Sequence, residues 1–531
     1  MKPYRFERAF DKFEIIDVTS SEGLDSLVSA IVAEPLHAVS PAGFALIDTI
    51  VRSGRCKTII MEKEYVDGDY RRAYQRYYAR AFPNYERHTT RLHFLGVKVT
   101  RRGLANLEAG KVGGEYLGYC VVRPLRTRKV GRTVLQPLLA APEADFPLAL
   151  SEFEVNVCGS RLVVSGAPFL EQDTRVGCCG SCAIWMSTMV AGRKFGLPTS
   201  TVAEITELAT DYALGERVLG STGLSWEEME GALRKMGYNP LSLGIASRES
   251  AMQIIHPYLE AGIAPILLLE LKGGLHAAVA VGHGYDPSQA AGEQAKVQWE
   301  GREIRFWRSS QWINYLLVHD DQRGPFRKMY VANASSGRGK KQHCSVEIDM
   351  QWPAFEGNAG WPVSAKGRLH AALIPVPPGI SMTGVEAEEK AARLTDMVFG
   401  SVLGRGMPSN IVLRTYLTRS NDYKRFARER GLVRKVRDLF RGKPLARWIW
   451  VTELCTVRDA TVSKREDRIV RGEVILDGNS SPWTPDFVAI HLIAGDVGYL
   501  ALMKPEDTDA ESAITGGLVY ARAGPYKALV R

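Results

Sequence analysis

The sequence predicts an α+β fold, and three observations lead to this prediction. The chain has 531 residues, and at roughly 100–200 residues per domain it is expected to form about three domains. Residues 165–332 show helical patterns first and strand patterns afterwards, an order typical of α+β domains. The composition, with 45% hydrophobic and 24% charged residues, is that of an ordinary globular protein.

Domain boundaries are expected where the composition changes. Residues 140–147 are rich in alanine, proline and acidic residues, and residues 333–342 read NASSGRGKKQ, a linker by composition. We therefore expect an N-terminal α+β domain at 1–150, a central domain at 151–335 and a C-terminal α+β domain at 336–531.

Charge and hydropathy limit the class of protein. The formal net charge of +9 permits an acidic partner without requiring one. The opening MKPYRFERAFDKFEIIDVTS has no apolar core of the kind that a secretory signal needs, and no apolar run reaches the ~18 residues of a membrane span. We expect a soluble, cytoplasmic protein without membrane contact, in which the eight cysteines are mostly free thiols.

Local patterns predict the elements of the N-terminal domain. Strands are expected at 43–51, 57–61, 91–100 and 119–124, and a helix at 69–81. This helix is dense in tyrosine and arginine. It can be a half-buried helix with the tyrosine rings inside, or a stacking platform for peptide or nucleic acid. The sequence does not separate the two.

The C-terminal domain combines a predicted helix at 387–402 with strands at 448–452, 469–476 and 487–493. Basic residues dominate between 414 and 447. This segment can be a solvated charged face, or it can dock an acidic partner or nucleic acid.

The central domain is expected to begin with a hairpin that pairs 153–157 with 161–164. A helix then starts within the stretch QDTRVGCCGSCAIWM at 172–186. Further helices are expected at 201–214, 225–236 and 248–261, the first two of which begin with capping boxes. Strands follow at 266–271, 276–282, 313–318 and 327–331, with a hairpin at 296–307.

Four side chains of this domain match the parts of a thiol-based active site. A thiol attacks a carbonyl as the thiolate, which a helix N-terminus and a neighbouring imidazolium stabilise. Cys179 stands where the helix begins, with Gly180 expected to let the backbone turn there, and His276 opens a strand. Asp320 ends another strand and can fix the tautomer of the imidazole, and Gln172 can donate to an oxyanion.

These motifs resemble those of the papain-like cysteine peptidases. HAAVAVGHG is similar to the strand that carries the histidine of that family, and YLLVHD to the strand that ends in its third catalytic residue, where papain itself has asparagine. CGSC also occurs in the papain motif. QDTRVGCCGSCAIWM is more similar to the bacterial branch that processes double-glycine leader peptides, in which a glutamine precedes a Cys-Gly pair by six or seven residues. The resemblance covers about 165–332 and implies a helical half plus an antiparallel sheet.

Three cysteines compete for the role of nucleophile. The papain pattern points to Cys182 and the leader-peptidase pattern to Cys179, while Cys178 is a third candidate. Cys179 follows Gln172 by seven residues, whereas Cys182 follows it by ten, too far for either pattern. Cys179 is therefore preferred, with Cys182 as the alternative. The chain lacks the tryptophan that follows CGSC in papain.

Other roles for these residues are also compatible with the sequence. Asp321 and Asp286 are rival orienters of the histidine, although Asp286 more simply forms a turn. The Cys-x-x-Cys pair could belong to a zinc or redox site, for which Cys158 and His283 would be further ligands, but no second Cys-x-x-Cys follows.

The sequence therefore predicts a bacterial-type cysteine peptidase that hydrolyses peptide or isopeptide bonds of a protein or peptide substrate, with no metal or organic cofactor. The same residues also support acyl transfer to an amine, as in transglutaminase-like enzymes. A third hypothesis is a catalytically idle scaffold on the same fold, which binds an acidic partner through its basic segment.

Overall fold

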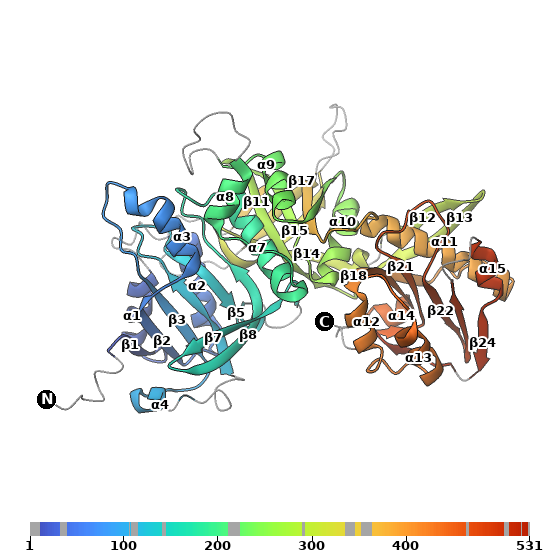
Figure 1. The fold of residues 1–531 in the computed structure, drawn as a ribbon, viewed down its shortest axis with the longest axis horizontal. Coiled ribbons are helices and arrows are strands. Elements are labelled where there is room, and N and C mark those ends of the chain that lie inside the picture. The colour runs from blue at the N-terminus through green and yellow to red at the C-terminus, as the bar shows by residue number, and fades with distance from the viewer. Residues whose placement is uncertain are drawn as a thin grey trace. The chain divides into compact units, whose positions relative to one another are not determined.

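The computed structural model describes most of the chain, and its contacts divide it into two compact units (Figure 1). Unit 1 comprises Met1–Gly244, Ile263–Gly282 and Tyr315–Pro375, and unit 2 comprises the rest. Both units mix helices and strands. The described residues are 11–31, 40–105, 107, 115–140, 145–210, 223–288, 292–334, 346–351, 364–462, 467–503, 509–521 and 523–528.

Unit 1 contains a sheet of seven antiparallel strands in the order β1-β2-β3-β4-β5-β8-β7. The predicted hairpin is confirmed: β7 and β8 pair, and their turn residues Cys158 and Gly159 both have positive φ. The β7–β8 hairpin extends the N-terminal sheet, because β8 also pairs with β5. The strands are β1 (Phe13–Asp17), β2 (Thr58–Tyr65), β3 (Thr89–Leu95), β4 (Tyr116–Val122), β5 (Val130–Leu135), β7 (Ser151–Val157) and β8 (Ser160–Phe169).

One predicted strand of this region is wrong, because residues 43–51 lie in the helix α2 (Pro41–Arg52). The side chain of Ser40 accepts a hydrogen bond from the backbone N–H of Gly43, and Pro41 occupies the first turn. Serine at the cap followed by proline is a helix start signal. Here that signal outweighs the apolar run that suggested a strand.

The second sheet of unit 1 is a closed ring of strands. Its order is β10-β11-β14-β15-β16-β17, and β10 also pairs with β17. Strands β6 and β9 attach to β11 and β17. The bounds are β6 (Asp145–Pro147), β9 (Asn239–Gly244), β10 (Ile266–Leu271), β11 (Gly274–Tyr285), β14 (Ile313–Asp320), β15 (Gly324–Asn333), β16 (Val346–Gln351) and β17 (Ser364–Val376).

Helices precede this ring in the chain, as the sequence predicts. The expected helix at 225–236 is α9, whose capping box between Ser225 and Glu228 is present. The expected helix at 201–214 is described only as far as residue 210, since 211–222 lie outside the described residues. The helices of unit 1 are α1 (Ser21–Ile31), α2, α3 (Gly68–Arg76), η3 (Tyr78–Arg80), α4 (Arg101–Ala105), α6 (Pro137–Ala140), α7 (Cys179–Phe195), α8 (Val202–Thr210) and α9 (Trp226–Lys235).

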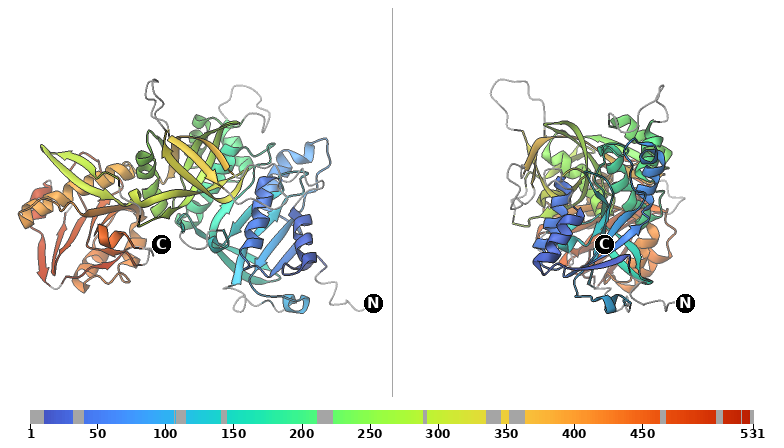
Figure 2. Two further views of the ribbon diagram at one scale, coloured as in Figure 1. Left: turned by 180° about the vertical axis from the view of Figure 1, so that it is seen from behind. Right: turned by 90° about the vertical axis from the view of Figure 1, so that its left-hand side faces the viewer.

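Unit 2 is built on a sheet in the order β12-β13-β18-β19-β21-β22-β23-β24, with helices on both faces (Figure 1 and, from behind, Figure 2). Neighbouring side chains of β19 contact helices on opposite faces of this sheet. Ile449 and Val451 pack into the core that includes Val436 and Phe440 of α13, whereas Trp450 meets the Tyr258 ring of α10 at 5.7 Å.

The elements of unit 2 include the strands predicted at 448–452 and 487–493 and the predicted hairpin at 296–307. The strand predicted at 469–476 is divided into β20, which pairs with β25, and β21, which belongs to the large sheet. The strands are β12 (Ala295–Trp299), β13 (Arg302–Arg308), β18 (Ile411–Arg419), β19 (Trp448–Thr456), β20 (Ile469–Val470), β21 (Gly472–Asp477), β22 (Ala489–Ala494), β23 (Val497–Leu502), β24 (Leu518–Ala521) and β25 (Tyr526–Lys527). The helices are α10 (Arg248–Ala261), η5 (Ser309–Trp312), α11 (Gly384–Leu403), α12 (Ser420–Phe426), α13 (Arg434–Gly442), α14 (Val457–Ala460) and α15 (Ala510–Thr515).

The boundaries expected at residues 150 and 335 do not coincide with the borders of the two units. Pairing of β5 with β8 joins the start of the expected central domain to the N-terminal sheet. Pairing of β15 with β16 and of β10 with β17 joins residues beyond 335 to the central sheet. Strand pairing between distant segments, which composition does not register, produces this division.

The basic segment 414–447 is only partly a surface. Arg430 is 3% exposed, and its guanidinium bonds to Glu473 at 2.8 Å and to Glu453 at 2.9 Å. Arg414 is also buried, between Glu453 and Glu260. These two arginines are counter-ions inside unit 2. The docking of an acidic partner or nucleic acid on the remaining exposed residues stays a prediction.

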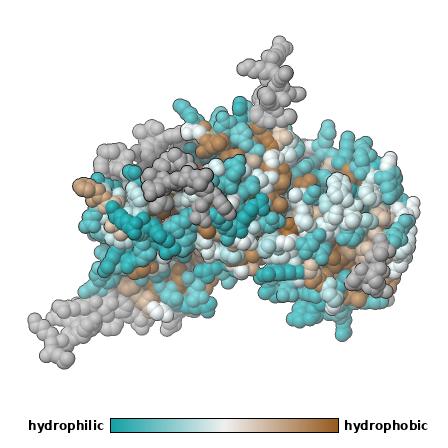
Figure 3. All heavy atoms as spheres, turned by 45° about the horizontal axis from the view of Figure 1, so that its top comes forward, coloured by the Kyte–Doolittle hydropathy of each residue, from teal (hydrophilic) through white to brown (hydrophobic). Residues whose placement is uncertain are grey.

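The face drawn in Figure 3 is mainly hydrophilic, with apolar side chains in scattered patches. Within the described part of the chain, no helix has both the length and the apolar character needed to cross a membrane.

The buried arginine network leads to a prediction about stability. Replacement of Arg430 by alanine leaves the carboxylates of Glu473 and Glu453 buried without this cation, so we expect a loss of about 3–5 kcal/mol in the free energy of unfolding. Arg428→Ala, at an exposed position of the same segment, is the control and is expected to stay within about 0.5 kcal/mol of the wild type. Urea denaturation followed by circular dichroism measures both, and equal midpoints would contradict the prediction.

Candidate active site

Cys179 is the first residue of α7, at the position predicted from the sequence. Cys178 is the N-cap residue in an extended conformation, and its backbone N–H donates to Oγ of Ser181 at 3.0 Å. Cys179 is half-buried, whereas Cys178 and Cys182 are buried. The unpaired N–H groups of the first helical turn favour negative charge, so this end of α7 suits a thiolate.

Gly180 is needed for packing and not for a turn, contrary to the expectation. It lies within α7. A Cβ atom at this position would stand 3.1 Å from both Cβ of Leu224 and Sδ of Met229 in α9. The missing side chain therefore lets α9 and the segment before it approach the first turn of α7.

His276 meets Asp320 inside unit 1, as predicted. Nε2 of His276 lies 3.0 Å from Oδ2 of Asp320, and both side chains are buried. Asp320 also accepts from the guanidinium of Arg323 at 2.9 Å and from the backbone N–H groups of Gln322 and Arg323. Its two oxygens are thus fully engaged, which holds the carboxylate in one orientation toward the imidazole.

The thiol of Cys179 also interacts with the His276 imidazole and helps to raise its pKa. Because Nε2 faces Asp320, Nδ1 is the nitrogen left for this thiol. The structure therefore brings Cys179, His276 and Asp320 together in the order that the sequence predicts: thiol, imidazole, carboxylate.

The electrostatics of this group favour a charged pair. Burial by itself lowers the pKa of His276, but the charge and hydrogen bond of Asp320 outweigh it, and the pKa is raised well above its usual value. Burial by itself raises the pKa of Asp320, yet the charge and hydrogen bond of His276 lower it far below the usual range.

Asp321 is a second carboxyl group beside the same imidazole. Its Oδ1 lies 3.6 Å from Nε2 of His276, and neither side-chain oxygen has a hydrogen-bond partner among the described residues. Burial raises the pKa of Asp321 to about 7, helped by the charge of Asp320 and opposed by that of His276. Asp320, with the shorter contact and the full set of donors, is therefore the better orienter.

The neighbouring cysteines are less suited to ionise. Burial raises the pKa of Cys182 well above its usual value, and the charge of Asp321 adds to this. Burial also raises the pKa of Cys178, although the hydrogen bond from Ser181 opposes it. A neutral, buried thiol is a poor nucleophile.

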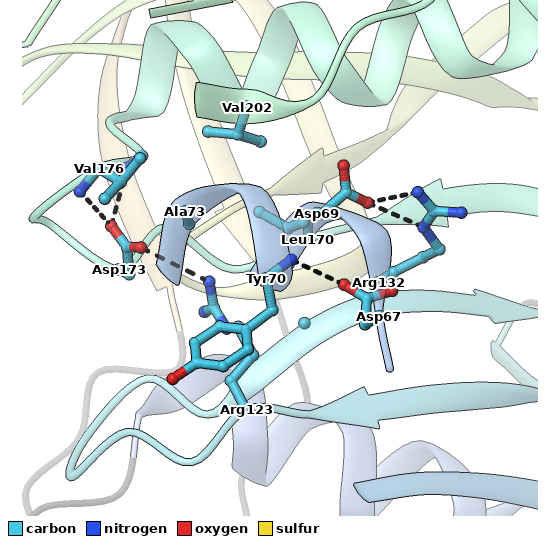
Figure 4. A pocket seen from close by; sticks show the side chains of 12 residues that line it. Asp67, Asp69, Tyr70, Ala73, Arg123, Arg132, Leu170, Asp173, Val176 and Val202 are labelled. Atoms are coloured by element: carbon cyan, nitrogen blue, oxygen red, sulfur yellow. Dashed lines mark hydrogen bonds and ion pairs between the residues drawn. The ribbon is translucent and has the colours of Figure 1, made fainter. Parts of the chain in front are cut away.

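The loop before α7 is built around Asp173, which the sequence reasoning missed. Its Oδ1 accepts from the backbone N–H groups of Arg175, Val176 and Gly177 at 2.8–2.9 Å, and Figure 4 shows the bond from Val176. Its Oδ2 accepts from the hydroxyl of Tyr78 at 2.8 Å. An aspartate that bonds the next backbone groups is a known turn device, so the sequence Asp-Thr-Arg-Val-Gly carried a usable signal.

The tyrosine- and arginine-rich helix α3 supports α7 from the side. Asp69 accepts from the indole N–H of Trp185 at 3.1 Å and is paired with Arg132 (Figure 4). The rings of Tyr70 and Tyr78 pack in one core with Val176. This is the half-buried arrangement considered for the helix from its sequence.

Gln172 lies close to Asp321 because the backbones of the two residues are hydrogen-bonded to each other. It is buried, and its backbone N–H donates to the carbonyl oxygen of Asp321 at 3.3 Å. The segment that carries Gln172 is thereby tied to the end of the strand that carries Asp320. Its role as an oxyanion donor stays a prediction.

Two groups of side chains among the described residues have the ligand types of a metal site. One is His276 with Asp320 and Asp321, the set already described. The other, in unit 2, is His256, Glu260 and His283, where cationic Arg414 and Arg468 side chains lie against the carboxylate of Glu260 and disfavour a metal cation. Neither group includes a cysteine, and Cys158, considered above as a zinc ligand, lies at the turn of the β7–β8 hairpin.

Comparison of the chain with protein-family models, with curated proteins and with solved structures found no match.

Asp321 leads to a prediction about stability and pH. Its pKa in the folded protein, about 7, exceeds the usual value of about 3.9 for the unfolded chain. At pH values between about 3.9 and about 7, folding is therefore accompanied by proton uptake at Asp321. The free energy of unfolding of the wild type falls as the pH rises through this range. Asp321→Asn removes the effect, so we expect it to be more stable than the wild type at pH 8, by about 1 kcal/mol or more, with a smaller difference at pH 4.

Urea denaturation at the two pH values measures this difference. Asp349→Asn, at a half-buried carboxyl on β16, is the control. If the difference in the free energy of unfolding between the wild type and Asp321→Asn does not grow with pH, the Asp321 carboxyl is not held neutral.

Proposed function

We propose that this protein is a cysteine peptidase of the papain-like kind, acting on peptide or isopeptide bonds. One observation carries the proposal. Cys179, half-buried at the N-terminus of α7, interacts through its thiol with the His276 imidazole, whose Nε2 is held 3.0 Å from the carboxylate of Asp320. This is the nucleophile, base and orienter relation that acyl-transfer chemistry requires.

The reaction begins with the Cys179 thiolate and the His276 imidazolium. The sulfur attacks the carbonyl carbon, a C–S bond forms, and the carbonyl oxygen becomes an oxyanion. N–H groups at the start of α7 and the side-chain amide of Gln172 stabilise this charge. The imidazolium gives its proton to the leaving amine as the C–N bond breaks, which leaves an acyl-enzyme.

Hydrolysis then completes the cycle. His276 takes a proton from a water molecule, which attacks the thioester, and the C–S bond breaks to release the acid and restore the thiolate–imidazolium pair. Asp320 stabilises the imidazolium and fixes its tautomer throughout, and it does not exchange a proton itself. No metal takes part in any of these steps.

The assignment of the nucleophile leads to the main test. We expect Cys179→Ala to abolish peptide hydrolysis and labelling by iodoacetamide at neutral pH, because it removes the thiol that contacts His276. Cys182→Ala is the matched control: it removes a buried thiol of the same helix and is expected to keep both, with a packing loss of about 1 kcal/mol. Mass spectrometry locates the label. Full activity in Cys179→Ala with none in Cys182→Ala would reverse the assignment.

The Asp320–His276 pair leads to a test of the charge relation. Asp320→Asn keeps the size of the side chain but removes the charge that raises the pKa of His276. The imidazolium is then lost at lower pH, so the thiol has less help in ionising near neutrality. We expect the rate of Cys179 labelling to rise at higher pH than in the wild type, by about one pH unit, and kcat at pH 7 to fall at least about tenfold.

Labelling rates measured between pH 5 and 10 give this shift. Asp286→Asn, at a half-buried turn position outside unit 1, serves as the control and is expected to leave the profile unchanged. A profile for Asp320→Asn that overlays the wild type would count against Asp320 as the orienter.

A further inference from the structure

One cavity of unit 1 contains none of the residues of the proposed active site. It has a volume of about 640 Å³, within the range of small-ligand sites. Its walls come from the end of β2, from α3 and the segment 85–90, and from the turn between β4 and β5. The basic lining residues are Lys63, Arg87, His88, Arg123 and Lys129, and the acidic ones are Glu64 and Glu86.

The charges of this cavity do not cancel. Glu64 is paired with Lys12, and Lys63 with Glu14. For Arg87 and Lys129, by contrast, no carboxylate lies within ion-pairing distance among the described residues. Glu86 is the other acidic residue of the lining, so the basic residues outnumber the acidic ones. Cations that converge on one cavity repel each other, and a bound anion relieves that repulsion.

Arg123 forms a rigid part of this surface. Its guanidinium donates to the backbone carbonyls of Arg128 at 2.6 Å and Glu171 at 2.8 Å, and it lies 4.0 Å from Asp173. The residue is 6% exposed and lines the cavity, so its guanidinium contributes a fixed positive charge to the wall.

Lys129 adds a second cation to the wall of this cavity. It is half-buried, and burial lowers its pKa, as expected for an ammonium group without a counter-charge. Tyr74 and Tyr85 line the same cavity and supply flat, partly apolar walls. A fixed guanidinium, a lysine and aromatic walls suit a small molecule that bears an oxyanion.

We propose that this cavity, which we call the Arg123–Lys129 site, binds a small ligand through a phosphate or carboxylate group. The oxyanion is held by Lys129 and Arg87, with the fixed charge of Arg123 in the wall behind them, and the remainder of the ligand lies along Tyr74 and Tyr85. The proposal is independent of the peptidase assignment, because it requires neither Cys179 nor His276.

Isothermal titration calorimetry tests the site with two probes, inorganic pyrophosphate for phosphates and citrate for carboxylates, in phosphate-free buffer at about 50 mM salt. We expect one binding site for at least one probe in the wild type, and the probe that binds more tightly assigns the group. Lys129→Gln is expected to weaken that binding about tenfold or more, as loss of one partly buried ion pair implies, and Arg87→Gln is expected to weaken it as well.

Lys272→Gln is the matched control, since Lys272 is an exposed lysine at the β10–β11 turn, far along the chain from the cavity. Its affinity should equal that of the wild type, and circular dichroism should show unchanged melting for all three variants. The proposal is overturned if neither probe binds at concentrations up to about 5 mM, or if Lys129→Gln and Arg87→Gln bind as tightly as the wild type.

Discussion

The arrangement of unit 1 depends on one buried contact, the 3.0 Å hydrogen bond between His276 and Asp320. A charged pair in the interior is stable only when its remaining polar atoms are satisfied. Here Arg323 and two backbone N–H groups complete the carboxylate, and Cys179 meets the imidazole from the other side. The ring of strands brings β11 and β14 together as neighbours, so the strand pairing that builds the sheet also places His276 beside Asp320.

The thiol is positioned by a different part of unit 1. Asp173 folds the loop before α7 onto itself, and Tyr78 and Asp69 connect this loop and α7 to the tyrosine-rich helix α3. The N-terminal sheet and its helix thereby act as support for the start of α7. The N-terminal residues and the residues of the proposed active site therefore belong to one unit. The composition of residues 140–147, by contrast, predicts a domain boundary between them.

Much of the local structure could be predicted, and the errors have identifiable causes. The α10 helix and the β7–β8 and β12–β13 hairpins follow periodicity and turn residues. The apolar run at 43–51 predicts a strand, but a run of that length fits a helix equally well, and the Ser40–Pro41 start produces the helix. Gly180 predicts a turn, but glycine serves turns and close packing alike, and only the contact with Met229 shows which applies.

The sequence by itself determined which residue types are available for thiol chemistry and the order in which they occur along the chain, because a helix start, a strand start and a strand end each have local signals. Only the tertiary structure decided that Cys179 and not Cys182 faces His276, that Asp320 and not Asp321 makes the short contact, and that Arg430 and Arg414 are buried. These outcomes depend on burial and on contacts between residues far apart in the chain. Local periodicity carries no information about either.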